Sequence, residues 1–494
     1  MRPAVARHNV VLSEKRTLKM AEQQLTGARV TAPLAATVDK KLSFGTKLSY
    51  GLGDFASQLM WTLASSYLVL FYTDNVGLAA ASVGVLMLVA RVADAVFDPM
   101  LGAFAERHPT KYGRFRPWLL FGAPILAVSV ILTFMTVPGG HTVKFVWALV
   151  TYLLMGFLYS AVNLPYGALS TVMTRDAQER VSLNSFRMIG TNLGAVALSA
   201  LTMPLILRFS GVGDGKTTTV GGFTITAAIM AVIAVPMFWT VFAKCKEVIQ
   251  PDIQQTKVPL KTTLKVVLGN KPLMLVAAAL FFILTGLFGR LAVAVYYYIY
   301  LMHRFDLIAL LMMLPSIAGA IGIAVFAPLA KLLGKKRTVT ISMIVTAVPT
   351  IILFFVNPSN VTMVIVLTAL YGLGNFAAPI IMSMVPDSID HAEDLTGVRS
   401  DGTAYAAVSL ATKIAAAVGA ALGAILLGAF GYVANAHEQT AQAAMGINFT
   451  VNIVPAVLSL LAIVPVLLYP ITEKSYAGIR ERLEARRSAA QAEV

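Results

Sequence analysis

Residues 116–173 run RPWLLFGAPILAVSVILTFMTV, then the turn PGGHTV, then KFVWALVTYLLMGFLYSAVNLPYGALSTVM. The turn therefore separates two strongly apolar runs, 116–137 and 144–173. Each run is long enough to cross about 30 Å of hydrocarbon as a helix. Because backbone polar groups in lipid must be paired within their own segment, we predict two membrane-spanning helices here.

The rest of the chain follows the same pattern. Of the 494 residues, 57% are hydrophobic and only 13% are charged, whereas soluble domains carry roughly 25% charged residues. The sequence therefore predicts an all-α membrane protein of twelve transmembrane helices. The predicted spans are 48–73, 78–105, 116–137, 144–173, 185–209, 220–243, 272–302, 307–331, 337–357, 360–386, 402–431 and 446–470.

The net charge of +15 comes from Lys and Arg clusters between the spans, not from one basic surface. This distribution argues against a nucleic-acid partner. The basic connections lie around 107–116, 175–180, 244–271 and 331–337, and they alternate with connections that are poor in Lys and Arg. The positive-inside rule then predicts a multi-pass protein of the bacterial inner membrane, with both termini in the cytoplasm.

The longest polar connection divides the predicted helices into two sets of six. A degenerate internal repeat supports the division, because Asp98-Pro99-Met100-Leu101-Gly102 and Ala327-Pro328-Leu329-Ala330-Lys331 end equivalent spans. The predicted organisation is a disordered cytoplasmic tail at 1–47, a six-helix half at 48–243, a cytoplasmic loop at 244–271, a second six-helix half at 272–471 and a cytoplasmic tail at 472–494.

Charged side chains inside the predicted spans need a specific role, because each costs on the order of 2.5–3.5 kcal/mol at mid-bilayer. The acids well inside spans are Asp54, Asp94 and Asp98, and the cations are Arg91, Arg187, Arg290 and Lys413. All six histidines fall in tails or connections. Any coupled cation is therefore expected to be handled by carboxylates.

Arg91, Asp94 and Asp98 stand at i, i+3 and i+7, on one face of the second predicted helix. Two carboxylates one turn apart repel each other unless a cation lies between them or one is protonated. We therefore predict a cation-coupling site. The alternative is a buried Arg91–Asp94 pair that only fixes helix packing.

Polar and aromatic side chains follow helical stripes on three other spans. Aromatic faces beside hydroxyls and amides suit a sugar, but the same residues also join helices without any ligand. These stripes comprise Tyr50, Asp54, Gln58 and Trp61; Tyr159, Ser160, Asn163 and Tyr166; and Tyr405, Ser409 and Lys413.

Several short segments, in order along both halves, resemble the glycoside–pentoside–hexuronide:cation symporters, a branch of the major facilitator superfamily. Within that family the chain is most similar to glucuronide carriers, notably at 159–167 and 431–435. The resembling segments are Tyr50-Gly51-Leu52-Gly53-Asp54, Phe71-Tyr72-Thr73-Asp74, Arg91–Pro99, Lys111–Pro117, Asn163-Leu164-Pro165-Tyr166-Gly167 and Leu395–Arg399.

The resemblance implies a major facilitator fold with a sugar site at the bilayer midplane and alternating access driven by a sodium or proton gradient. It assigns the cation to Asp94 and Asp98, and it matches Lys413 to the family's cavity lysine on the eleventh helix and Arg187 to its fifth-helix arginine.

The chain departs from melibiose-type members of that family at three positions. Gln58 and Asn163 replace carboxylates that bind sugar there, and Phe97 replaces an asparagine between the cation carboxylates. The first change argues against a galactoside bound as in those members. The second removes an oxygen ligand for Na⁺, so proton coupling is favoured, with Na⁺ at Asp94 and Asp98 as the alternative.

A count of in-span charges predicts an anionic substrate. If Arg91 and the coupled cation balance Asp94 and Asp98, then Arg187, Arg290 and Lys413 face Asp54 alone, and a carboxylate on the ligand would compensate the excess. The residues assigned to the substrate are Asp54, Gln58, Trp61, Tyr159, Asn163, Tyr166, Arg187, Arg290, Tyr405 and Lys413.

The sequence therefore predicts a monomeric symporter that imports a hexuronide-like sugar and needs no cofactor other than the coupled H⁺ or Na⁺. Alternatives are a neutral-glycoside or amphiphile transporter of the same fold, or a non-transporting membrane sensor. An enzyme is disfavoured, because no metal-ligand cluster, Ser/His/Asp set or soluble catalytic domain is evident in the sequence.

Overall fold

The structure is a computed structural model that describes residues 41–107, 110–174, 176–212, 216–248, 269–396, 401–436 and 438–492. Within these ranges the regular secondary structure is helical, apart from one isolated bridge between Thr110 and Gly113. Most of the predicted tail at 1–47 and of the predicted loop at 244–271 lies outside the described residues.

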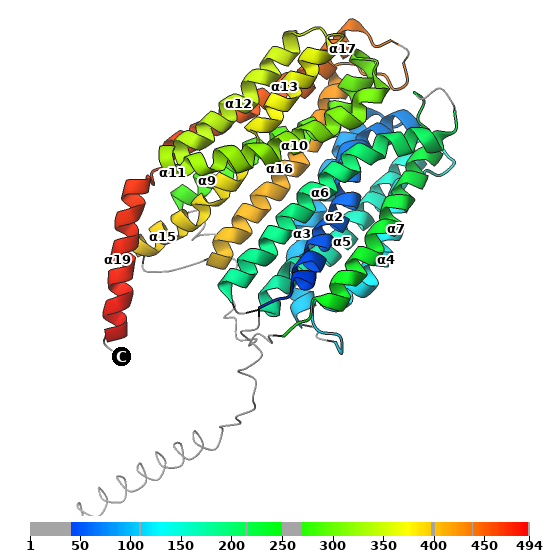
Figure 1. The fold of residues 1–494 in the computed structure, drawn as a ribbon. Helices are drawn as coiled ribbons and strands as arrows, with labels where there is room; N and C mark the ends of the chain where they lie inside the picture. The colour runs from blue at the N-terminus through cyan, green and yellow to red at the C-terminus, as the bar shows by residue number, and fades with distance from the viewer. Residues whose placement is uncertain are drawn as a thin grey trace, which may run out of the picture.

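The first half of the chain forms one bundle, coloured blue to green in Figure 1. Its elements are α2 (Phe44–Leu70), which continues into a π-helical turn η2 (Phe71–Asn75), then α3 (Ala80–Arg107), η3 (Trp118–Gly122), α4 (Ala123–Thr133), α5 (His141–Met173), α6 (Ala177–Ser210) and α7 (Val220–Lys244).

The second half lies beside the first and is coloured green to red (Figure 1). Its elements are α9 (Lys271–Tyr296), η4 (Tyr297–Leu301), η5 (Phe305–Leu307), α10 (Ile308–Phe326), η6 (Ala327–Leu329), α11 (Ala330–Leu333), α12 (Lys335–Phe355), α13 (Val361–Gly374), α14 (Ala377–Met382), α15 (Met384–Thr396), α16 (Asp401–Ala429), α17 (Ala441–Asn448), η7 (Phe449–Ile453), α18 (Val454–Leu468) and α19 (Glu473–Ala492).

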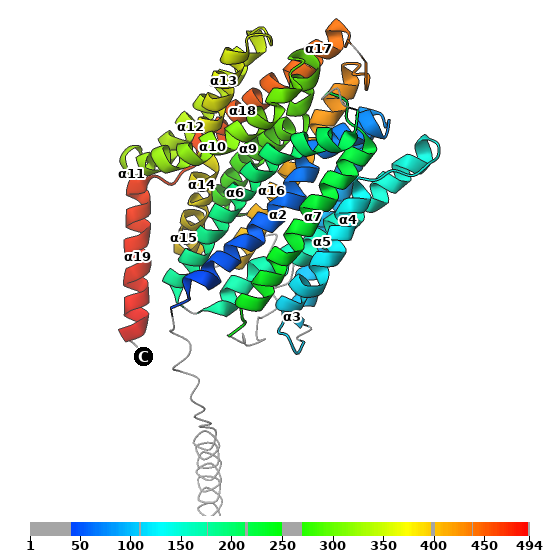
Figure 2. The same ribbon diagram turned by 45° about the vertical axis from the view of Figure 1, so that its right-hand side comes forward.

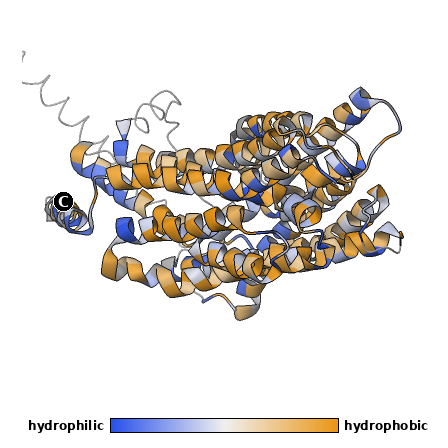
Figure 3. Ribbon diagram, turned by 90° about the horizontal axis from the view of Figure 1, so that it is seen from above, coloured by the Kyte–Doolittle hydropathy of each residue, from blue (hydrophilic) through white to orange (hydrophobic). Residues whose placement is uncertain are grey.

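Nine helices of the described chain are long and apolar enough to cross a membrane, and Trp118–Thr133 is a shorter apolar helix. Helices α2 and α3, with 27 and 28 residues, are as long as these nine but are not among them. They contain the in-span charges at Asp54, Arg91, Asp94 and Asp98. In the ribbon coloured by hydropathy, hydrophobic residues recur along the helices of the bundle (Figure 3). The all-α membrane fold is confirmed, and membrane crossing by α2, α3 and the shorter helix stays a prediction.

The structure differs from the predicted segments in several places. Helix α6 begins at Ala177, eight residues before the predicted span 185–209. The predicted span 360–386 is interrupted, because α13 ends at Gly374 and α14 begins at Ala377. The predicted C-terminal tail 472–494 contains a helix, α19, which packs on α15 and buries Ile479 and Leu483. The residues of α19 have a low mean hydropathy. The prediction relied on long apolar runs and therefore did not identify this helix.

Among the described residues, the most extensive helix contacts between the two halves join α2 with α9, α3 with α16, and α6 with α10. Within the first half, α2 and α6 cross so closely that a Cβ at Gly190 would overlap the Gly51 carbonyl. Small residues of this kind let membrane helices approach each other. The turned view of Figure 2 shows the same side-by-side arrangement, with α17 at one end of the bundle and α19 at the other.

The ends of the bundle differ in charge. We call the end with the connections 76–79, 134–140, 356–360 and 430–440 the Lys/Arg-poor end, and the end with the clusters around 111–116 and 335–337 the Lys/Arg-rich end. At the Lys/Arg-rich end the Glu247 carboxylate accepts backbone N–H bonds from Arg114, Phe115 and Arg116, at 2.8, 2.7 and 3.0 Å. These bonds tie the start of the η3–α4 helix to the end of α7.

Candidate functional site

The predicted cation cluster on α3 is buried against α5. Arg91 Nη1 donates to Asp94 Oδ2 at 3.1 Å, and Arg91 Nη2 donates to the phenol oxygen of Tyr152 at 2.9 Å. Asp94 is buried. The Arg91–Asp94 pair of the packing alternative is therefore present, and the cation role of Asp94 stays a prediction.

Asp98 makes its ion pair across the interface between the halves. Its Oδ2 accepts a hydrogen bond from the Lys413 ammonium on α16, while its buried Oδ1 has no hydrogen-bond partner in the described structure. A carboxylate oxygen that is dry and unpartnered is costly, and it is an open position for a proton or a cation. The side chain of Phe97, next to it in sequence, is 42% exposed and contacts the ring of Phe157.

A cavity of about 330 Å³ adjoins these acids. It brings together predicted residues from four helices of both halves: Trp61 of α2, Arg91, Asp94 and Asp98 of α3, Tyr159 of α5 and Lys413 of α16. We call it the charged cavity.

Two aromatic rings form one wall of the charged cavity. Trp61 stacks on Tyr159 with ring centroids 4.6 Å apart, and the Arg91 guanidinium lies 4.0 Å from the centroid of Trp61. Arg91 therefore contacts Asp94 and Trp61 at once, so a change in the charge of the acid is felt at the aromatic wall.

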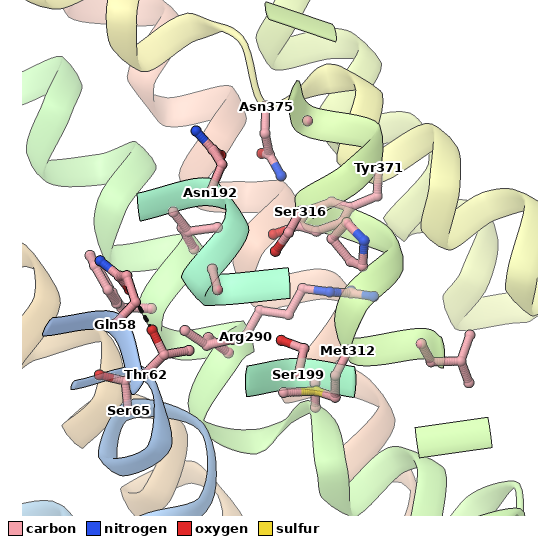
Figure 4. Close-up of a pocket in the computed structure, with 18 of the residues that line it drawn as sticks. Gln58, Thr62, Ser65, Asn192, Ser199, Arg290, Met312, Ser316, Tyr371 and Asn375 are labelled. Carbon is pink, nitrogen blue, oxygen red and sulfur yellow. Dashed lines mark hydrogen bonds between the residues drawn. The ribbon is translucent and has the colours of Figure 1, made fainter. Parts of the chain in front are cut away.

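A second cavity, of about 320 Å³, lies between the halves and shares Trp61 and Phe288 with the first. We call it the polar cavity. Figure 4 shows its polar side chains, which converge from both halves: Gln58, Thr62, Ser65, Asn192 and Ser199 from α2 and α6, and Arg290, Ser316, Tyr371 and Asn375 from α9, α10, α13 and the residue after α13. A volume of this size is typical of small-molecule sites.

Among the described residues that line the polar cavity, Arg290 is the charged one, and it is only 5% exposed. Its Nη1 donates to the Val451 carbonyl at 2.8 Å and to Asn452 Oδ1 at 2.9 Å, and its guanidinium lies 4.4 Å from the ring centroid of Tyr371. All three partners are neutral, and no carboxylate of the described residues pairs with it. The positive charge of Arg290 is therefore uncompensated by an acid.

A helix break places Asn375 at this cavity. Gly372 and Gly374 end α13 where it crosses α10 and α12 so closely that a Cβ at either position would overlap its neighbours. Ser342 of α12 donates to the Gly374 carbonyl, which satisfies one acceptor that the interrupted helix leaves open. Asn375 itself, with ψ of 41°, leaves the helical path.

Some predicted substrate residues are engaged in helix packing. Arg187 Nε donates to Asp54 Oδ2 at 2.6 Å, joining α6 to α2. The phenol of Tyr166 donates to the Tyr50 carbonyl at 2.5 Å, and Asn163 Nδ2 donates to Ser57 Oγ at 3.2 Å. None of the four predicted residues lines either cavity within the described structure.

The prediction that Arg187, Arg290 and Lys413 together face Asp54 alone is therefore wrong. Arg187 is neutralised by Asp54 and Lys413 by Asp98, so Arg290 alone carries the excess among the four predicted in-span cations. A count along the sequence could not reveal this, because Asp98 and Lys413 are 315 residues apart. Tyr405 is 44% exposed and is not part of either cavity wall in the described structure.

Sequence reasoning missed several polar residues of the polar cavity, namely Asn192, Ser199, Ser316, Tyr371 and Asn375. Each is a lone polar group inside an apolar span, and that is the signal that could have found them. They carry no charge, so a prediction based on charged residues inside spans does not include them.

Comparison with known proteins identifies relatives over nearly the whole chain. Residues 49–473 match a family model described as MFS/sugar transport protein. An uncharacterized symporter YnaJ of Bacillus subtilis is 34% identical, with 90% of this chain and 96% of the relative covered. An isoprimeverose transporter of Lactiplantibacillus pentosus is 35% identical, with 92% and 94% covered. A glucuronide carrier protein homolog of Escherichia coli is 30% identical, with 92% and 98% covered.

Among solved structures, a point mutant of the nucleoside transporter NupG is similar with a TM-score of 0.60. The alignment covers 86% of this chain and 100% of that structure at 14% sequence identity. At this identity the likeness concerns the fold alone.

Proposed function

Because this chain belongs to the MFS/sugar transport protein family and is a membrane transporter, not an enzyme, we propose that it imports an anionic, hexuronide-like sugar together with a proton. The resemblance to the glycoside–pentoside–hexuronide:cation symporters is confirmed by the relatives named above. The proposal concerns the class of sugar, the direction of transport and the identity of the coupled cation. The roles given to the site residues below are part of it.

Arg290 carries the proposal for the substrate. A buried guanidinium without an acid partner is unfavourable, and a carboxylate of the ligand would compensate it with bidentate geometry. The amides and hydroxyls around it in the polar cavity offer partners for sugar hydroxyls, and Trp61 contributes an aromatic ring to the same cavity wall.

Asp98 carries the proposal for the cation. A proton on the unpartnered Oδ1 would remove the negative charge that holds Lys413 across the interface. The contact between α3 and α16 would then weaken and let the halves rearrange. Phe97 contributes no oxygen, which favours a proton over Na⁺, since Na⁺ needs several oxygen ligands.

Arg91 and Trp61 link the two cavities in this scheme. A change of charge at Asp94 or Asp98 alters the field on Arg91, whose guanidinium lies over Trp61 at the boundary with the polar cavity. Protonation and sugar binding would then influence each other. By the positive-inside rule, we propose that the Lys/Arg-rich end faces the cytoplasm of a bacterial inner membrane.

The deciding experiment compares methyl glucuronide with methyl glucoside on the purified protein, by calorimetry, and by uptake into proteoliposomes. We expect tighter binding of the glucuronide by at least about tenfold, one ion pair being worth about 1.4 kcal/mol or more in a dry site. Uptake should follow an inward proton gradient and collapse with a protonophore. Equal affinity for the two ligands would overturn the anionic substrate.

A neutral glycoside is the second candidate, because Arg290 already has two hydrogen-bond acceptors and the face of Tyr371. It predicts equal binding of both ligands with sugar uptake retained. Uptake that requires Na⁺ at fixed pH and ignores the protonophore would instead assign Na⁺ as the coupled ion.

A further inference from the structure

Two motifs noted in the sequence have no part in either cavity. One is the segment 71–74, which ends in Asp74 at the end of α2, and the other is 431–435, between α16 and α17. They are some 360 residues apart and belong to different halves. In the structure they are bonded to each other at the Lys/Arg-poor end.

The Asp74 carboxylate is the centre of this contact. Tyr432 donates to its Oδ1 at 2.5 Å and Tyr300 of η4 donates to its Oδ2. Thr73 also donates to Oδ1, at 2.6 Å. Asp74 thus belongs to the first half, while both tyrosines belong to the second.

Further bonds reinforce the same junction. Asn435 Nδ2 donates to the Asp74 carbonyl at 2.5 Å, and the Asn435 backbone N–H donates to the Tyr300 phenol oxygen at 3.2 Å. The hydroxyls of Thr73 and Tyr296 lie 2.7 Å apart, again across the halves. The rings of Tyr296, Tyr300 and Tyr432 pack on one another with centroids 5.1 to 6.3 Å apart.

Asn435 is held in an unusual backbone conformation, with φ of +57°. Outside glycine, left-handed residues store strain and concentrate where a contact must be specific. The Asn435 side chain and N–H both point into the junction, so bonds to Asp74 and Tyr300 hold it in that conformation.

Asp74 has no cationic partner among the described residues, so hydroxyls alone stabilise its charge. When the halves separate and water reaches the carboxylate, bonds from water replace the bonds from the hydroxyls. The net free-energy difference of such an exchange is small for each bond, so the contact can open and close reversibly.

We propose that Asp74, with Tyr300, Tyr432 and Asn435, forms the outer gate of the transporter, closed in this structure. The inference goes beyond the proposed substrate and cation, but it rests on alternating access. When the halves separate at the Lys/Arg-poor end, the hydroxyls leave the Asp74 carboxylate and water takes their place. Weakening these bonds then favours the state that is open at this end.

The test measures the distance between the halves directly, by electron paramagnetic resonance of two spin labels. The labels are placed at Thr142 of α5 and Ser359 before α13, both exposed at the Lys/Arg-poor end, in a Cys245→Ser background. Cys245 is the sole cysteine and is buried. The reconstituted full chain is measured with no sugar present, so the result does not depend on the substrate.

Tyr300→Phe and Tyr432→Phe each remove one hydroxyl and keep the ring. Because a hydrogen bond to a charged group is worth roughly tenfold in equilibrium constant, each variant should raise the ratio of long-distance to short-distance populations by about tenfold. Asp74→Ala, which removes every bond to the carboxylate, should raise it further.

Asp306→Ala is the matched control. Asp306 is also an acid at the Lys/Arg-poor end, but its partner Arg304 lies in the same half, so the distances should not change. Distance distributions of both phenylalanine variants that match the parent would overturn the gate. If Asp74→Ala does not fold, the two phenylalanine variants decide the question alone.

Discussion

At the residue scale, substitution of Arg290 tests whether this residue binds the carboxylate of a sugar or only packs helices together. Replacing it by Gln keeps hydrogen-bonding capacity towards Val451 and Asn452 but removes the charge. We expect the preference for methyl glucuronide over methyl glucoside to fall from at least about tenfold to near unity, with neutral-sugar binding retained. Calorimetry on both ligands measures the ratio of the two dissociation constants.

Arg187→Gln is the control for that variant, because Arg187 is paired with Asp54 and lies outside both cavity walls in the described structure. Its expected effect is lower thermal stability with an unchanged ratio of affinities. A ratio that stays high in Arg290→Gln and falls in Arg187→Gln would move the substrate carboxylate to the α2–α6 contact.

Asp98 offers a second test at this scale. Asp98→Asn keeps the volume of the side chain but cannot release Lys413 by taking up a proton. We expect accumulation of sugar against its gradient to be lost, about 10-fold or more, while exchange of labelled for unlabelled sugar persists. Asp94→Asn should behave in the same way. Normal accumulation in both variants would contradict the coupling site on α3.

At the element scale, Glu247 shows how one side chain fixes a helix start. Its carboxylate accepts three backbone N–H bonds beside Gly113, whose φ is +107°. Glu247→Ala leaves those groups unpaired and should lower stability by about 2 kcal/mol or more. A lower melting temperature in detergent is the expected readout. Glu438→Ala, an exposed acid elsewhere, should leave it unchanged.

The helices were largely predictable from the sequence, and the breaks within them were not. Apolar runs give the spans because lipid forces every backbone group into a helix, and α7 matches its prediction to within one residue. The break after Gly374 depends on how closely α13 crosses α10 and α12. That crossing is a tertiary property with no local signal, so Asn375 was not predicted at the site.

Pairings between helices were likewise out of reach. The i, i+3, i+7 spacing correctly put Arg91 and Asp94 together, because one helix fixes that geometry. The partners of Asp98 and Asp74 come from the other half, and no spacing rule reaches them. The resemblance flagged both segments, 71–74 and 431–435, without saying that they meet.

At the scale of the whole molecule, the distribution of basic residues predicts its orientation. Thr142→Cys, at the Lys/Arg-poor end, should react with a membrane-impermeant maleimide in intact cells. Lys474→Cys, exposed on α19 at the other end, should react only after permeabilisation. Cys245→Ser serves as the unlabelled background. The reverse pattern would invert the topology and turn the proposed outer gate into an inner one.

Contacts of the molecule differ in how they respond to dissolved salt. Both side chains of the Arg480–Glu484 ion pair on α19 are more than half accessible. Dissolved salt screens such pairs within about 10 Å at 0.1 M, but it hardly reaches groups buried away from water. The Asp74 carboxylate is only partly exposed, and its partners are hydroxyls, not an oppositely charged side chain. Salt therefore has no ion pair to screen there, and we expect the contact at the proposed gate to change little with ionic strength.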